Sequence, residues 1–310
     1  MKQDYDVICI GMALIDSIIK GFDPNPVSAS GYRAESGSLF VGGEAVNEAV
    51  TAAKLGLRAA ILCSLGRDDA GEMVLHSLKA YGVDTSLVVR SDGHPTPVTT
   101  MFVRSDGTRK SITNHSHAYN FHPEQYVSAF ERAGAVILGS LFRAPFDDPD
   151  VIEAVLTAAK KNGLKVFADT KLPNFRTLTL EDLRGALPLM DYITPNEDEA
   201  KYYTKKETPE EMADVFLSYG VPNVIIKLGG KGCFFKNAGT SCFLPALSVH
   251  AVDATGAGDH FIAGFASEIL RGNTPEGALR FANACGAVCA SSMGALTGLK
   301  NREQVMSLLR

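Results

Sequence analysis

The chain has 310 residues, of which 45% are hydrophobic and 21% are charged, a composition that is typical of globular proteins and excludes a disordered chain. Its formal net charge of -5 argues against a nucleic-acid partner, which usually meets a basic surface. The length fits one large α/β domain or two ordinary ones.

The amino-terminal residues, MKQDYDVICIGMALID, carry acids where a signal peptide would be basic, so we expect no secretion signal. No apolar run approaches the roughly 18 residues that cross a bilayer. We expect the scattered cysteines to be reduced core residues, which favours a cytoplasmic protein without membrane partners. They are Cys9, Cys63, Cys233, Cys242, Cys285 and Cys289.

Short apolar runs alternate with helical patterns along most of the chain. Strands are predicted within residues 5–11, 59–66, 135–142, 164–170, 191–196 and 223–230. Helical patterns that end in Gly occupy residues 44–56, 70–82, 150–163 and 209–220. Thr208 is expected to cap the last of these, with Glu211 completing a capping box. The alternation predicts an α/β fold, a mostly parallel sheet with helices on both faces.

Two stretches interrupt this alternation. Residues from about 14 to 40 lack a helical pattern, and residues from about 97 to 114 are typical of a β-hairpin that turns at Ser105 to Gly107. We expect both to form one small β-sheet lid over an end of the main sheet, inserted in a single domain, 1–310. Two unrelated surface hairpins are the alternative.

Small residues crowd into the stretch HAVDATGAGDHFIAGF, residues 250–265, just before a helical pattern. The pattern indicates an extended run, a loop and then a helix, the strand-to-helix junction where α/β proteins bind ligands. Gly256 and Gly258 allow close backbone approach, and a helix start offers N–H groups to an anion. Asp259 could then accept the proton of a hydroxyl that attacks a bound phosphoryl group. A plain turn capped by Asp259 is the alternative.

The loop resembles the second signature of the ribokinase-like (PfkB) carbohydrate kinases, D-x-T-G-A-G-D, which matches residues 253–259. The P-loop and dinucleotide-binding signatures are absent. Further stretches resemble family landmarks in the family's order: GMALID, VGGEAVNEAVTAAKLG, LGRDDAGEMVLHSLKAYGVDT, TPNEDEA and IIKLGGKGC. The resemblance implies a three-layer α/β/α ribokinase-like core with a β-sheet lid, and ATP-dependent phosphorylation of a hydroxymethyl group on a sugar.

The resemblance also implies a role for each matching residue. Asp259 would be the catalytic base, and the backbone of Gly256, Ala257 and Gly258 would stabilise the transferring phosphoryl group. The implied sugar ligands are Asp16, Gly42, Gly43 and Asn47. The implied nucleotide contacts are Asn196, Glu199, Lys227, Gly229, Gly232 and Asn283, with Glu199 organising Mg²⁺ through water. The implied monovalent-cation site, for K⁺ where a member requires it, is Asp253, Thr255 and Gly294.

Some of these residues could instead have a purely structural role. Asp16 would also suit a strand end, Asn196 a helix cap, and Asn283 a solvated helix face. Arg104, Arg109 and Lys110 could meet an acidic ligand, but we expect them on a solvated face of the hairpin. For His115 and His117 we expect sugar contacts or the surface, and no metal site.

Two departures from the family pattern concern the substrate. Glu44 stands where some members that act on sugar phosphates have a lysine, and its charge favours a neutral acceptor. Lys171 stands where fructokinase-like members have an asparagine, which leaves an anionic substrate or a different nucleotide contact open.

We therefore predict a cytoplasmic kinase of a neutral sugar that uses ATP and Mg²⁺, with a homodimer through the lid as an open question. A sugar-acid kinase is one alternative. A nucleoside kinase is another, and an apolar lid would favour it. A catalytically silent sugar-binding regulator and an NAD-dependent oxidoreductase are the alternatives of other classes.

Overall fold

The computed structural model describes residues 3–22, 31–106, 108–114 and 121–309. These residues form a large sheet of eight strands, five neighbouring pairs of which are parallel, with an antiparallel extension at one edge. In spatial order the strands are β14 (Ser241–Pro245), β13 (Gly232–Asn237), β12 (Asn223–Lys227), β11 (Tyr192–Ile193), β10 (Lys165–Thr170), β9 (Ala135–Leu141), β1 (Val7–Ile10) and β4 (Ala59–Leu62).

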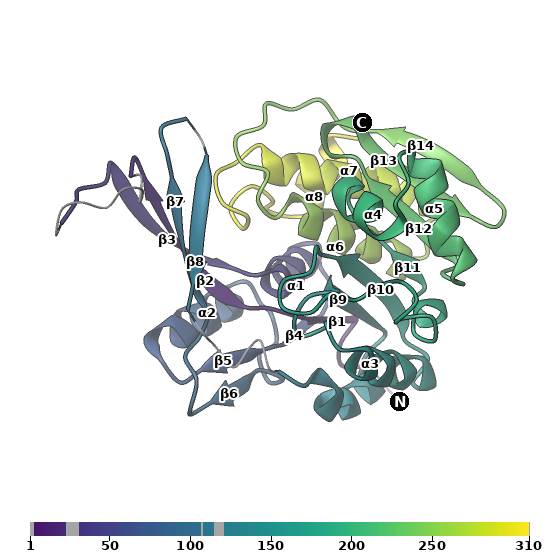
Figure 1. Cartoon of the computed structure of the whole chain (residues 1–310), viewed down its shortest axis with the longest axis horizontal. Helices are drawn as coiled ribbons and strands as arrows, with labels where there is room; N and C mark the ends of the chain where they lie inside the picture. Colours follow the sequence, from purple (N-terminus) through teal and green to yellow (C-terminus); the bar gives the residue numbers. More distant parts are fainter. Residues whose placement is uncertain (1–2, 23–30, 107, 115–120, 310) are drawn as a thin grey trace.

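Helices cover both faces of this sheet, because its central strands are apolar on both sides (Figure 1). In β1, Ile8 and Ile10 join the core on one face while Val7 and Cys9 join the core on the other. The first core includes α3 (Pro149–Lys161), α4 (Glu197–Thr204) and α5 (Pro209–Ser218). The second core includes α1 (Glu44–Lys54), α2 (Asp69–Ala80), α6 (Ala257–Leu270) and α7 (Pro275–Ala290). The predicted α/β fold with helices on both faces is therefore confirmed.

The helix ends follow the sequence signals. Thr208 caps α5 and exchanges hydrogen bonds with Glu211, so the predicted capping box is confirmed. The remaining elements are short: α8 (Arg302–Ser307), the paired strands β5 (Ser64–Gly66) and β6 (Val89–Ser91), and the 3₁₀ segments η2 (Pro123–Arg132), η3 (Leu187–Leu189) and η4 (Gly229–Lys231). No helix in the described ranges has the length and apolar character needed to cross a membrane.

A second sheet, which we call the lid, projects from one side of the body (Figure 1). Its strands are β3 (Ser36–Gly42), β2 (Leu14–Lys20), β7 (Val98–Val103) and β8 (Arg109–Thr113), in that spatial order. The hairpin predicted around residues 97–114 is confirmed as the β7–β8 pair. Gly107 in its turn, residues 23–30 of the first stretch, and His115 and His117 lie outside the described residues.

Strand register divides the lid into two faces, because side chains opposite one another across a sheet point the same way. Asp16 pairs with Phe40 and Thr99, and Lys20 pairs with Val103, which in turn pairs with Arg109. This inner face is directed at the body, where several of its side chains line a cavity described below. The neighbouring row, which includes Leu39 and Ile112, belongs to the outer face, where both side chains are exposed.

Two expectations need correction. The residues before α6 do not form a strand: β14 ends at Pro245, and an irregular segment then runs to Gly256. The predicted strand-to-helix junction is therefore a long loop. Its Val252 and Asp253 N–H groups donate to the carbonyl of Ala290 in α7, at 2.8 and 3.1 Å. All six cysteines are free as predicted, but Cys242 is only half-buried because it lies on the edge strand β14.

Candidate active site

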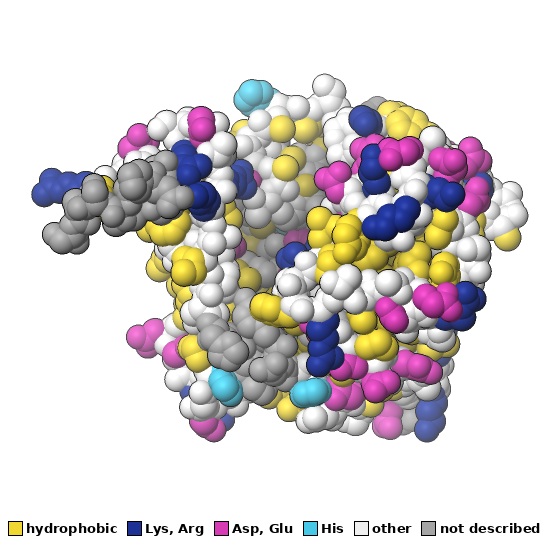
Figure 2. All heavy atoms as spheres, in the orientation of Figure 1, with side chains coloured by type: hydrophobic (Ala, Val, Ile, Leu, Met, Phe, Trp, Pro, Cys, Tyr) yellow, Lys and Arg dark blue, Asp and Glu magenta, His cyan; other side chains and the backbone are white. Residues whose placement is uncertain are grey.

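A cavity of about 230 Å³ lies between the lid and the body, and we call it the lid cavity. It is lined by Asp16, Gly42 and Asn47 of the predicted sugar site and by Asp253, Thr255 and Gly294 of the predicted cation site. Gly43 is not part of the lining. The space-filling view shows the molecule hollowed on this side, between the lid and the body (Figure 2).

A second cavity, of about 390 Å³, lies beside the carboxyl end of β12, and we call it the loop cavity. All of its lining comes from residues 227–290. It includes Lys227, Gly229, Gly232 and Asn283 of the predicted nucleotide contacts, and Gly258 of the backbone predicted to stabilise the phosphoryl group. Asn283 is buried, with its amide near the carbonyl oxygen of Pro245 at 3.3 Å. The alternative of a solvated Asn283 is therefore wrong.

The amino terminus of α6 connects the two cavities. Gly256 caps the helix in the left-handed conformation, at φ 80°, and Asp259 in the first turn is buried. Asn47 Nδ2, from the wall of the lid cavity, donates a hydrogen bond to Asp259 Oδ2 at 2.8 Å. Gly258, one residue before Asp259, lines the loop cavity. The predicted base therefore lies between lining residues of the two cavities, although it belongs to neither lining and 212 residues separate it from Asn47.

Glycines allow the close approaches on which this arrangement depends. A Cβ on Gly42 would lie 2.5 Å from Asp16 Oδ2, and one on Gly256 would lie 2.6 Å from the Cβ of Ala295. Gly43 caps α1 at φ 100°, where a Cβ would lie 2.4 Å from the carbonyl oxygen of Met12. Gly43 thus serves the turn into α1, which presents Asn47, without contacting the lid cavity itself.

The Asp16 carboxyl is half-buried in the lid cavity, and this burial raises its pKa to about 6. A partly buried carboxyl with an elevated pKa that faces a cavity is a candidate ligand-binding group. Asn47 has a complementary feature, because its Oδ1 is buried and has no hydrogen-bond partner among the described residues. Together, one carboxylate and one unpaired amide oxygen can accept hydrogen bonds from several hydroxyl groups.

Two lysines flank a fully buried carboxylate, Asp169, near the carboxyl end of β10. Lys227 pairs with its Oδ1, which also accepts a hydrogen bond from Thr194 Oγ1 at 2.8 Å. Lys171 Nζ lies 3.0 Å from Asp169 Oδ2 and 3.4 Å from Asp259 Oδ1. Burial alone would raise the pKa of Asp169, but the two ammonium groups hold it below its usual value. Lys171, whose role the sequence left open, thus adjoins the predicted base.

Asn196 and Glu199 form a capping box at the start of α4, as the structural reading of this segment predicts. Glu199 is also buried, and its Oε2 accepts hydrogen bonds from Thr170 Oγ1 at 2.8 Å and from Asn196 N–H at 2.9 Å. Burial raises the pKa of Glu199, while Lys227 opposes that increase. The carboxylate therefore faces the lysine pair and caps its helix at the same time.

The residues of the predicted monovalent-cation site lie together. Asp253 Oδ1 accepts hydrogen bonds from the backbone N–H and the hydroxyl of Thr255, at 3.1 and 2.7 Å, and its Oδ2 accepts one from Gly294 N–H at 3.1 Å. Partial burial raises the pKa of Asp253, but these hydrogen bonds outweigh it and leave the pKa below its usual value. Asp253 is therefore an anionic group at a fixed position in the wall of the lid cavity.

Glu44 does not line the lid cavity. Its Oε1 accepts a hydrogen bond from Met12 N–H at 2.9 Å and another from Ser140 Oγ. The repulsion expected between Glu44 and an anionic substrate is therefore not a direct contact. Arg109 differs from its expected place too, because this exposed side chain lines the outer part of the cavity instead of only facing solvent. Lys110, on the opposite side of β8, stays on the outer face.

Glu48 is a buried acid that the sequence analysis did not single out. Both carboxyl oxygens are buried in α1 and have no hydrogen-bond partner among the described residues. Burial raises the pKa of Glu48 well above its usual range; Asp259, Asp169 and Glu44 raise it further, and Lys171 opposes them. The only available sequence signal was its spacing of four residues from Glu44, which places both acids on one side of the helix.

Replacing Glu48 with Gln should make protein stability less sensitive to pH. A carboxyl whose pKa is raised by folding stabilises the fold below its unfolded pKa, about 4.3, and this contribution is lost as pH rises through the folded pKa. Chemical denaturation across pH should show wild-type stability decreasing more steeply than that of Glu48→Gln. Parallel curves for the two proteins would contradict a neutral, buried Glu48. The exposed acid Glu153, on α3, provides the matched control Glu153→Gln.

Comparisons with known proteins identify the family of this chain. Residues 5–302 match the family model described as pfkB family carbohydrate kinase. A ribokinase from Haemophilus influenzae is 30% identical over 276 residues, covering 87% of this chain and 88% of that protein. A 2-dehydro-3-deoxygluconokinase from Bacillus subtilis is 31% identical over 288 residues, covering 88% of this chain and 87% of that protein.

A solved structure extends the similarity to three dimensions. The Arabidopsis thaliana ribokinase complexed with ribose and ATP superposes with a TM-score of 0.88 at 27% identity, covering 100% of this chain and 99% of that one. Since the family model also spans nearly the whole sequence, this chain is a ribokinase-like enzyme that belongs to the pfkB family of carbohydrate kinases.

Proposed function

We propose that this chain transfers the γ-phosphoryl group of ATP to a hydroxymethyl group of a neutral sugar, with Asp259 as the general base. The observation that carries the proposal is the hydrogen bond from Asn47 to Asp259, which joins the lid cavity to the amino terminus of α6. The sugar would occupy the lid cavity and ATP the loop cavity. Gly229 suits the nucleotide side, because a Cβ there would meet nothing within 4 Å.

In the reaction, the attacking hydroxyl loses its proton to Asp259 as its oxygen bonds to the γ-phosphorus. The bond from that phosphorus to the bridging oxygen breaks, and ADP leaves with the electron pair. Backbone N–H groups at residues 256–258 stabilise the charge of the transferring group, supported by the positive end of the α6 dipole. Asp16 and the unpaired Asn47 Oδ1 hold the other sugar hydroxyls and so orient the attacking one.

We place Mg²⁺ near Glu199 and Asn196, where it would neutralise charge on the ATP phosphates. The buried Glu199 carboxylate fits this ion, because hard oxygen ligands suit Mg²⁺ and water can bridge the remaining distance. For K⁺, the proposed site is the loop around Asp253, Thr255 and Gly294. Hydrogen bonds fix the Asp253 carboxylate there, beside the amino terminus of α6.

Two features of the inner lid face favour other acceptors as second candidates. Its middle is apolar, with Ile18, Phe40 and Met101, which would suit the base of a nucleoside. Its outer part carries the cations Lys20 and Arg109, which would suit the carboxylate of a sugar acid.

Arg109→Gln should therefore raise the KM of an acidic acceptor about tenfold or more and leave that of a neutral sugar unchanged.

A coupled assay of ADP release over neutral sugars, sugar acids and nucleosides, with and without K⁺, tests the proposal. We expect ADP release that depends on one acceptor class and on Mg²⁺. Acceptor binding without turnover would instead identify a sugar-binding regulator, and nicotinamide binding would identify an oxidoreductase.

The lid supports two further parts of the proposal. We expect it to close over the sugar and exclude water, which protects ATP from hydrolysis.

The exposed outer face of the lid, where Leu39 is 57% and Ile112 is 65% exposed, is the proposed homodimer contact. Light scattering should give a dimer that Ile112→Asp converts to a monomer, whereas a monomeric wild type would exclude the contact.

A cytoplasmic location is part of the proposal as well. It is supported by the free state of all six cysteines, five of which are buried. A reducing compartment favours this state. Cell fractionation with a tagged full chain tests the location directly.

A further inference from the structure

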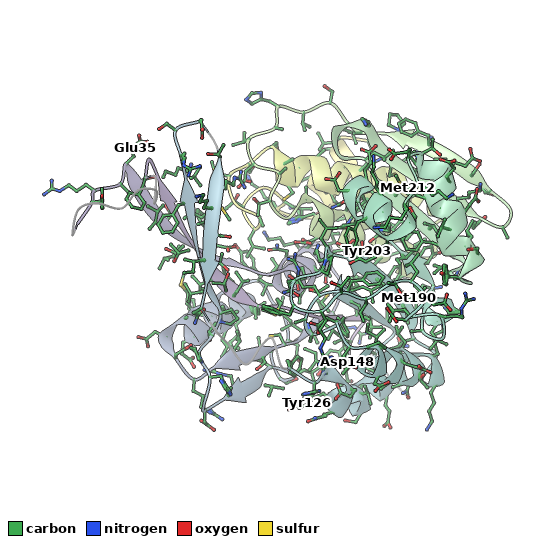
Figure 3. All side chains as sticks on the ribbon, in the orientation of Figure 1. Glu35, Tyr126, Asp148, Met190, Tyr203 and Met212 are labelled. Atoms are coloured by element: carbon green, nitrogen blue, oxygen red, sulfur yellow. The ribbon has the colours of Figure 1, made fainter. Side chains whose placement is uncertain are left out.

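The backbone of Lys171 is fixed just beyond the carboxyl end of β10. Its N–H donates to the carbonyl of Leu141 at 2.9 Å, and its carbonyl accepts a hydrogen bond from the Tyr203 hydroxyl at 2.7 Å. The Tyr203 ring stacks on Phe142 at 3.9 Å between centroids, and Figure 3 shows Tyr203 near the middle of the molecule. Both ends of the residue are thus anchored, so the ammonium group has a defined starting point.

Asp169 by itself does not explain why a second lysine lies here. Lys227 already pairs with Asp169, and Thr194 supplies a further hydrogen bond. Moving another ammonium out of water is costly unless it meets additional negative charge. Glu199 and Glu44 add to the negative field around Lys171, and together with Asp169 and Asp259 they raise its pKa well above the usual range against the effect of burial. The ammonium group is therefore retained in an environment with an excess of carboxylates.

The hydrogen-bonding capacity of Lys171 is not exhausted. An ammonium group has three N–H donors, and the described residues accept two hydrogen bonds from it, through Asp169 and Asp259. The side chain is 23% exposed, so the third donor has access to an incoming ligand. Because Nζ lies 3.4 Å from Asp259 Oδ1, that donor is within a few ångströms of any hydroxyl that Asp259 deprotonates.

We propose that Lys171 is a catalytic residue whose ammonium group contacts the phosphoryl group during its transfer. The proposal rests on the function proposed above, with Asp259 as the base. While the phosphorus–oxygen bond to ADP breaks and the bond to the sugar oxygen forms, Lys171 donates a hydrogen bond to a non-bridging phosphoryl oxygen. It keeps its own proton throughout, and Asp259 receives the proton of the hydroxyl.

The geometry also gives Lys171 a counterion before ATP binds. In the structure the ammonium compensates the charge of Asp259, which would otherwise oppose the approach of the ATP phosphates. A cation positioned in advance needs no reorganisation when charge develops in the transition state. Lys171 thus lies beside the first turn of α6, through its pair with Asp259, and beside Lys227, with which it shares Asp169.

Steady-state kinetics of Lys171→Met provide the main test. Met keeps the length of the side chain and removes the charge, so kcat should drop about 10²- to 10³-fold, the usual effect of losing one transition-state donor. The sugar KM should change less than about threefold, and Lys171→Arg should recover part of kcat. Lys160→Met removes a surface ammonium paired with Asp191 and should behave as wild type.

Two further readouts separate contact with the phosphoryl group from an action through Asp259. The kcat of Lys171→Met should be lower than that of wild type by the same factor at every pH from about 6 to 9. If kcat recovered at high pH, Lys171 would act only by keeping Asp259 ionised, and the proposed contact would be overturned. Aluminium fluoride, which mimics the transferring group, should tighten ADP binding by wild type in the presence of the sugar. Lys171→Met should lose this tightening while binding ADP alone normally, and retained tightening would also overturn the proposal.

The outcomes distinguish this proposal from the one on which it rests. Wild-type protein that releases no ADP with any acceptor would refute the kinase function itself. Active wild type together with a near-normal kcat for Lys171→Met would refute only the role of Lys171. Thermal denaturation of each variant shows whether it is folded, and the charge-preserving Lys171→Arg keeps the test decisive if Lys171→Met does not fold.

Discussion

Replacing Asp259 with Asn should lower kcat about 10²- to 10⁴-fold, the range that general-base catalysis contributes. An amide cannot take the proton of the attacking hydroxyl, whereas the Asp259 carboxylate lies between both cavities and can. The fold should persist, because the Asn oxygen still accepts the hydrogen bond from Asn47 and Lys171 keeps its pair with Asp169. Initial rates with the best acceptor of the screen measure the effect.

The control for this variant is an aspartate outside both cavities. Asp148 caps α3 through a hydrogen bond from Asp150 N–H at 3.0 Å, and Asn is an equally good cap. Asp148→Asn should therefore retain wild-type kcat, and it should lose at most about 1 kcal/mol of stability with the exposed ion pair to Arg176. If Asp259→Asn remained within a few-fold of wild type, Asp259 would not be the base, whatever its position.

Replacing Asp16 with Ala should raise the KM of the sugar about 10- to 100-fold and change that of ATP little. The carboxylate is placed to accept hydrogen bonds from sugar hydroxyls, and each charge-assisted hydrogen bond contributes roughly 1.5–3 kcal/mol. ATP is unaffected in this account, because the loop cavity draws its lining from residues 227–290. Ser17→Ala, one position along β2 and on the other face of the lid, is the matched control. Equal effects on both substrates would contradict a sugar contact.

The same carboxyl predicts a pH dependence of sugar binding. Burial raises the pKa of Asp16 to about 6, and only the ionised form offers all of its oxygen lone pairs to hydroxyl donors. Affinity for the sugar should therefore be full above about pH 6 and decrease as pH falls through that value. Asp16→Asn should bind more weakly with a flatter profile, which calorimetric titration can measure. An unchanged slope would assign the pH dependence to another group.

Local sequence signals predicted the body well, because each depends on neighbouring residues. The capping box of Thr208 and Glu211 and the apolar strands could be recognised from spacing alone. The segment before α6 misled the prediction because its apolar residues resemble a strand, whereas tertiary hydrogen bonds to α7 hold it as a loop. Asn283 was ambiguous for a similar reason, since periodicity does not say what covers a helix.

Contacts between distant segments were beyond the reach of sequence patterns. Lys171 and Asp259 are 88 residues apart, and they meet because α6, which begins at Ala257, packs on β10 through Phe265 and Phe167. Glu48 gave no signal either, because an acid in a helix is usually solvated. It is buried here because α1 packs against both the sheet and α6, so that residues 45–52 are all buried. The family resemblance supplied the positions of Asn47 and Asp259 without the hydrogen bond between them.

The walls of the two cavities come from different parts of the sequence, and this separation has an evolutionary consequence. The wall of the loop cavity is encoded by one continuous stretch, residues 227–290, whereas much of the lid cavity comes from residues 16–109. With the sugar in the lid cavity and ATP in the loop cavity, as proposed above, mutations in the first third of the gene would change the acceptor and leave the ATP-binding wall intact. Laboratory libraries aimed at new acceptors should accordingly target the lid strands and spare the carboxyl-terminal third.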